Sequence, residues 1–172
     1  MYPKAYIDYL VFFHGPRDYF ECHEVLEEYW KQDGNQIRNS FWVGLIQVAV
    51  ALYHQRNGNM NGAQRTLTKA ISILNRNINI LNEYGINKQF INKLEKRLYE
   101  IKSHTAYYSF NIPIDDQVLL NTCQKICEEL GYKWGSASDL YNESLVHKHR
   151  LRDRTEIIKE REKQKKLREE KQ

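Results

Sequence analysis

The sequence predicts an all-α protein, a compact antiparallel bundle of about six helices from which a charged C-terminal helix projects. Through most of the chain, apolar residues recur at intervals of three and four, as they do on one face of a helix. No stretch of useful length alternates apolar and polar residues as a strand does. The chain has 172 residues, of which 41% are hydrophobic, so it is long enough for one domain with a sizeable core.

Three helices are expected before residue 60. A short amphipathic helix from about 4 to 13 stops at the turn 14–16, which leads into a second helix that ends near 33–35. The third helix, near 37–56, is apolar nearly all round and therefore belongs at the centre of the fold. Gly44 on this helix helps to form a groove of small residues where another helix backbone can approach.

Three further helices follow, separated by loops. A long amphipathic helix is expected at 61–81 and ends at 83–85, and a fifth helix has its apolar face at 90–101. The chain at 103–114 is expected to be irregular. Asp115 or Asp116 caps a sixth helix that ends at Gly131, and a loop follows at 132–138.

The net charge of +4 is concentrated in the tail. Residues 147–172 contain eleven Lys and Arg against six Asp and Glu and carry a net +5, whereas the rest of the chain carries −1. The tail has too few apolar residues for a heptad seam, so we expect a solvated, fraying helix or disorder there. We therefore expect a bundle domain at 1–146 and a charged segment at 147–172.

Cysteine usage and the lack of a long apolar run favour a cytoplasmic protein without membrane contact. Cys22, Cys123 and Cys127 are an odd number, and no secretory signal is evident, so a disulfide framework is not expected. The longest apolar stretch, 41–53, is too short to span a bilayer. Cys123 and Cys127 lie one turn apart, which favours a shared apolar helix face over metal ligation.

The most informative segment runs from His23 to Trp30, because a helix sets His23 and Glu27 one turn apart. Helical angles place His23 on the core-facing side and Glu27 at its edge. Glu24 and Glu28 fall farther round and are expected in solvent. Ionisable groups are costly to hold against a core unless something satisfies them, so the segment indicates either a site or a buried polar network.

The third helix supplies partners for these groups. Gln47 is its only polar side chain within 41–53, and His54 lies two turns later on the same stripe. If the second and third helices pack antiparallel, the two sets of polar residues converge. The candidate pocket therefore comprises His23, Glu27, Trp30, Gln47 and His54.

Three interpretations of this pocket are open. His23, Glu27 and His54 would suit zinc or another divalent transition metal, with Gln47 orienting a water. The same groups could act as acid and base on a small ligand. Alternatively, they form a hydrogen-bonded network that fixes helix register, with Trp30 in the core.

No motif assigns a reaction. A zincin has His at the fifth position of H-E-x-x-H, where this chain has Glu27, and the paired E-x-x-H motifs of a di-iron bundle are not evident.

The same residues resemble an uncharacterised helical family, domain of unknown function 309. The resemblance covers about residues 10–81 and rests on Gly15, the run 19–27, Trp30, 44–47, Ala49, 51–54, 58–59 and 62–63. It implies an all-helical fold and no established activity, cofactor or partner. His14 departs from the pattern, which would have a small polar residue such as Asn, and the charged tail lies outside it.

Two other functions compete with a ligand or metal pocket. The turn at 58–59 and the helix after it loosely resemble a tetratricopeptide hairpin, which suggests a non-enzymatic module that binds a protein partner, although no 34-residue repeat follows. The tail could contact RNA or another polyanion, although its six acidic residues dilute its eleven basic ones.

Overall fold

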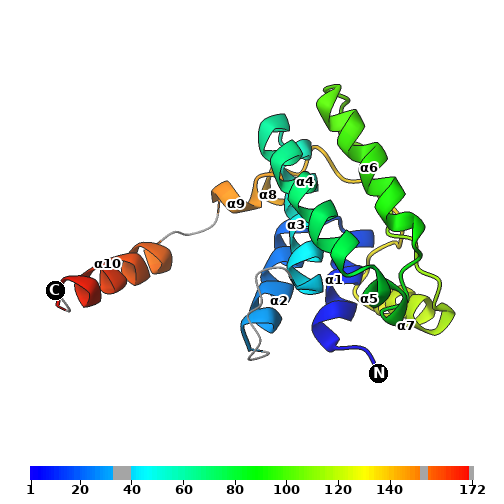
Figure 1. Cartoon of the computed structure of the whole chain (residues 1–172), viewed down its shortest axis with the longest axis horizontal. Coiled ribbons are helices and arrows are strands. Elements are labelled where there is room, and N and C mark those ends of the chain that lie inside the picture. Colours follow the sequence, from blue (N-terminus) through cyan, green and yellow to red (C-terminus); the bar gives the residue numbers. More distant parts are fainter. Residues whose placement is uncertain (33–39, 152–154, 171–172) are drawn as a thin grey trace.

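The computed structural model describes residues 1–32, 40–151 and 155–170, and it confirms that these are all-α (Figure 1). The helices are α1 Lys4–His14, α2 Tyr19–Gln32, α3 Phe41–Arg56, α4 Met60–Arg76, α5 Ile78–Glu83, α6 Gln89–Lys102, α7 Gln117–Glu129, α8 Glu143–Val146, α9 Lys148–Leu151 and α10 Thr155–Glu169. The described ranges hold no strand, and their one β-bridge, Ile86 to Ile114, is isolated. The predicted end of the second helix at 33–35 and the start of the third at 37 lie outside the described residues.

The helix α3 lies at the centre, as its apolar composition predicts. Ser40 caps it by accepting the Val43 N–H through its hydroxyl at 3.4 Å. It packs against α2 and α4. Gly44 permits the close approach of α4, because a Cβ built there would lie 2.7 Å from Cδ2 of Leu74. Gly44 thus makes room for side chains of α4, and no backbone atom of α4 is among the three nearest atoms to that position.

The expected single helix at 61–81 is wrong at Asn77, where the structure divides it into α4 and α5. The Asn77 backbone leaves the helical region at φ −112° and ψ 27°. Its side-chain amide donates to the carbonyl of Ile73 at 2.8 Å, which satisfies a group at the end of α4. The apolar spacing continues across this break and so conceals it.

Arg17 joins the turn between α1 and α2 to two distant loops. Its side chain is fully buried and its backbone adopts φ +57°. The guanidinium donates to the carbonyls of Phe110 and Ser136 and to the side-chain oxygen of Asn111. The loops at 103–116 and 132–142 are thereby held against the start of α2.

His14 fixes the same region from the end of α1. Its Nε2 accepts the Ile112 N–H at 2.9 Å, so Nδ1 carries the hydrogen and donates to the Leu10 carbonyl at 2.8 Å. The ring stacks on Trp134 with centroids 4.3 Å apart. Burial lowers the pKa of His14 to about 3, so this ring is neutral at pH 7.

The segment after residue 142 first returns to the bundle. Val146 is buried, and its carbonyl accepts a hydrogen bond from the Asn57 side chain at 2.7 Å. Lys148 pairs with Asp18 at 2.8 Å and with Glu21 at 3.4 Å. Residues that we assigned to the charged segment thus contact α2, whereas Figure 1 shows α10 apart from the other helices.

None of the helices in the three described ranges is both long and apolar enough to cross a membrane.

Candidate functional site

The helix α2 places a histidine and two carboxylates at the boundary of the core. Asp18 starts the helix by accepting the Glu21 N–H at 3.0 Å. The face that begins at the fully buried Tyr19 continues through Leu26. His23 lies beside this face, and 30% of its side chain is exposed. It is therefore at the boundary of the core, whereas the prediction placed it on the core-facing side.

His23 contacts a carboxylate with each ring nitrogen. Its Nδ1 lies 3.1 Å from an oxygen of Glu24, and its Nε2 lies 3.2 Å from an oxygen of Glu27. Glu27 is 32% exposed, and its other oxygen pairs with the ammonium of Lys31 at 3.0 Å. Glu28, expected in solvent, is exposed.

One potential ligand atom from each of His23, Glu24 and Glu27 lies within 4.8 Å of the others. An imidazole nitrogen and carboxylate oxygens are common ligands of divalent transition metals. We call these three residues the α2 cluster. Its membership differs from the predicted ligand set, because Glu24 belongs to it and His54 does not.

A depression beside the α2 cluster contains four of the five predicted pocket residues. It holds about 570 Å³ of space, part of it open to solvent, between α2, α3 and α4. Its lining consists of His23, Glu27, Trp30, Val43, Ile46, Gln47 and Lys69. The helices α2 and α3 therefore bring the partly buried Trp30 and the predicted amide of Gln47 to the same depression as the cluster.

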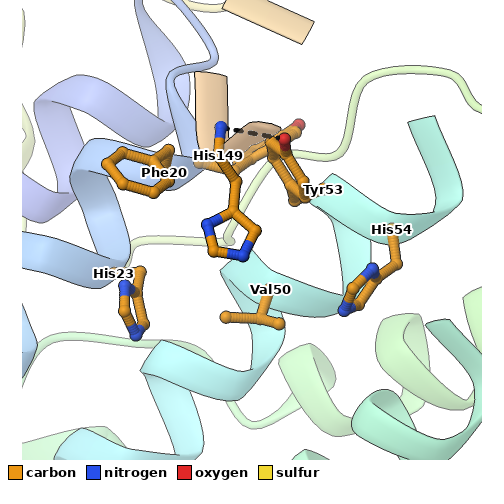
Figure 2. Close-up of a pocket in the computed structure, with 7 residues that line it drawn as sticks. Phe20, His23, Val50, Tyr53, His54 and His149 are labelled. Atoms are coloured by element: carbon orange, nitrogen blue, oxygen red, sulfur yellow. Dashed lines mark hydrogen bonds between the residues drawn. The ribbon is translucent and has the colours of Figure 1, made fainter. Parts of the chain in front are cut away.

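His23 also borders a second depression, which contains His54. The structure places Phe20, His23, Val50, Tyr53, His54 and His149 around it, together with the buried Tyr19 (Figure 2). We call it the histidine pocket; it holds about 520 Å³, part of it open to solvent. Three imidazoles from α2, α3 and α9 thus border one space.

His149 was not predicted as a site residue. Its backbone N–H donates to the Tyr53 hydroxyl at 3.1 Å, and its ring stacks on Phe20 with centroids 5.8 Å apart. In Figure 2 the His149 ring lies between His23 and His54. His149 was overlooked because it lies in a charged segment that was expected in solvent. The nearby apolar residues Leu145 and Val146 were the sequence signal that this part of the chain packs on the bundle.

Hydrogen bonds at the start of α4 fix the tautomer of His54. The side-chain oxygen of Asn59 accepts the Gly62 N–H at 3.0 Å, so the amide nitrogen of Asn59 faces His54 Nδ1 at 3.2 Å. Nδ1 therefore accepts, and Nε2 of the neutral ring carries the hydrogen. Burial, followed by the charges of His149 and Arg65, lowers the pKa of His54.

Comparison with known proteins gives a family and no activity. The sequence profile of the family described as "Domain of unknown function (DUF309)" matches residues 6–66. The chain is 50% identical over 165 residues to "Uncharacterized protein YpuF" of Bacillus subtilis (strain 168), and the alignment covers 95% of each chain. No solved structure gives a significant match.

Proposed function

This chain belongs to the DUF309 family, and we propose that it binds a divalent transition-metal ion through the α2 cluster of His23, Glu24 and Glu27. The observation that carries the proposal is the convergence of one potential ligand atom from each residue within 4.8 Å. The cluster is half-exposed, so an ion can reach it from solvent.

The surroundings of the α2 cluster support a metal site with both nitrogen and oxygen ligands. A zinc ion bound to Nε2 of His23 and an oxygen of Glu27 would replace their present 3.2 Å contact with two bonds of about 2.0–2.2 Å. Glu24, which contacts Nδ1 on the other side of the ring, would then orient the imidazole from behind, as carboxylates often do. Gln47 lines the depression beside the cluster and can hydrogen-bond a water on the ion.

The alternative function is that of a non-enzymatic interaction module in which the α2 cluster is only a structural network. The ion pair between Lys31 and Glu27 favours this alternative, because it satisfies one carboxylate without any ligand. The two functions differ in one measurable property, which is whether the cluster takes up a metal ion.

A zinc titration of full-length, tag-free protein tests the proposal. Isothermal calorimetry should give one site per chain, and Glu27→Gln should weaken it at least about tenfold, which is about 1.4 kcal/mol. Glu28→Gln is the matched control, because Glu28 is exposed one residue away and hydrogen-bonds Gln32 instead. If the protein takes up no zinc, or if both variants lose the same zinc affinity, the cluster is a structural network and the alternative function stands.

A reducing cytoplasm is the compartment that we propose for this function. Cys22, Cys123 and Cys127 are all free and buried. Cys123 and Cys127 pack in the hydrophobic core, as their spacing predicts. The chain thus shows the cysteine usage of a protein that folds without disulfides.

A further inference from the structure

We propose that the histidine pocket binds a small organic anion with an apolar body, with the anionic group at His54 and the body between Phe20 and Val50. This site is distinct from the α2 cluster and does not require a metal ion, although His23 borders both.

The walls of the pocket suit an apolar body of limited size. The aromatic rings of Phe20 and Tyr53 and the side chain of Val50 line it, and its enclosed part is about 170 Å³, so it can take only a small group. Figure 2 shows Val50 below the His149 ring, between His23 and His54. A ring or short aliphatic chain can therefore contact apolar groups on several sides.

His54 supplies a hydrogen-bond donor at one end. Its Nδ1 is occupied by the Asn59 amide, so the Nε2 hydrogen remains for a ligand. The two ring nitrogens of His23 at the other end already face Glu24 and Glu27. The fixed donor at His54 selects an acceptor, such as a carboxylate oxygen.

The charges nearest the His54 end are positive. Arg65 and His149 both act on His54 in the direction that disfavours a second positive charge. Within the part of the chain that the structure describes, Arg65 has no carboxylate within 4 Å. An anion is favoured there over a cation.

The negative charges lie at the opposite end of the pocket. Glu24 and Glu27 are next to His23, and the carboxylates of Asp18 and Glu21 pair with Lys148, whose ammonium lies 5.8 Å from the Phe20 ring centre. This polarity sets the orientation, because a carboxylate at the His23 end would meet two like charges.

Three small molecules, each with a benzene ring but with different charges, separate the contributions of the charged group and of the apolar body to binding. Benzoate, benzyl alcohol and benzylamine are titrated into full-length protein, and binding is followed by NMR through the Val50 methyl groups and the histidine ring protons. Benzoate should saturate these shifts and bind at least about tenfold more tightly than the other two. Equal or tighter binding of benzylamine would overturn the proposed sign of the ligand charge.

Two variants locate the binding. Val50→Phe fills the pocket and should abolish the benzoate shifts; His54→Leu removes the donor with little change in volume and should weaken benzoate at least about tenfold. Should Val50→Phe fail to fold by circular dichroism, His54→Leu alone decides. Unchanged benzoate binding in the folded variants, or no saturation in the wild type, would refute the site.

A third variant separates this inference from the metal proposal. Glu27→Gln should leave benzoate binding unchanged while it weakens zinc, since Glu27 does not line the histidine pocket. Loss of zinc binding alone would remove the proposed function and leave the anion site standing; loss of benzoate binding in Glu27→Gln would show that the two sites are one.

Discussion

The Nε2 atom of His23 lies 3.2 Å from a carboxylate oxygen of Glu27, one helical turn further along α2. The opposite nitrogen of the same ring reaches Glu24 at 3.1 Å. One imidazole therefore joins two carboxylates that helical geometry points in different directions. This arrangement makes a three-residue cluster from a single helix.

The close contact of α3 with α4 gives the first prediction. Gly44→Ala should destabilise the protein by about 1–2 kcal/mol net, because overpacking against Leu74 outweighs the gain in helix propensity. Urea unfolding measures the change. A double-mutant cycle with Leu74→Ala should show a favourable coupling, since the smaller residue makes room for the new methyl group; strictly additive effects would contradict the contact.

The buried His14 predicts a specific loss of stability in acid. Its folded pKa of about 3 lies below its ordinary value of 6.5, so its contribution is complete above pH 6.5 and is lost as the pH falls from there toward 3. Between pH 7 and pH 5 the loss should be about 2 kcal/mol, because the unfolded chain takes up the proton that the folded chain excludes.

Urea unfolding of wild type and His14→Gln at both pH values isolates this contribution. Glutamine keeps a donor and an acceptor but does not titrate, so the variant should lose about 2 kcal/mol less between pH 7 and pH 5. Equal losses would mean that His14 is accessible to protons in the folded protein.

The guanidinium of Arg17 predicts the largest effect on stability. Arg17→Met removes the donor to three acceptors on the two loops and should cost about 3 kcal/mol or more, since buried acceptors are left unpaired. The exposed Arg76→Met is the control and should change stability by less than about 0.5 kcal/mol. Similar unfolding midpoints for the two variants would contradict the role of Arg17.

Local signals in the sequence predicted most of the helices, but not the break between α4 and α5 or the short helices α8 and α9. They also missed the contacts made over long separations. Spacing of apolar residues marked α3 and the face of α2, because these patterns are properties of one helix. Arg17 escaped notice because its three partners lie 93 to 119 residues further along the chain. A single sequence contains no local trace of such pairing.

The structure brings four of the five predicted pocket residues to one depression, places His54 in another, and adds Glu24 to the cluster around His23. A helical wheel separates Glu24 from His23 by about 100° and therefore assigns Glu24 to solvent. The wheel ignores the length and rotation of side chains, which allow the His23 ring to contact residues in both directions. His149 was missed because apolar content, the main signal for docking, is nearly absent around it.

The charged C-terminal helix should be independent of the bundle. A chain that ends at Leu151 should unfold within about 0.5 kcal/mol of the full chain, because the described side chains of α10 are exposed. A loss of several kcal/mol would show that the tail packs on the core. If the full chain binds RNA at low salt and the truncated chain does not, the tail is the polyanion contact; equal binding would exclude that role.

The most direct test of the metal site is a crystal structure of the full chain grown with zinc, with data collected at the zinc absorption edge. We predict an anomalous peak about 2.0–2.2 Å from Nε2 of His23 and from an oxygen of Glu27. A map without a peak at the α2 cluster, in which His23 and Glu27 keep their direct contact, would contradict metal binding there.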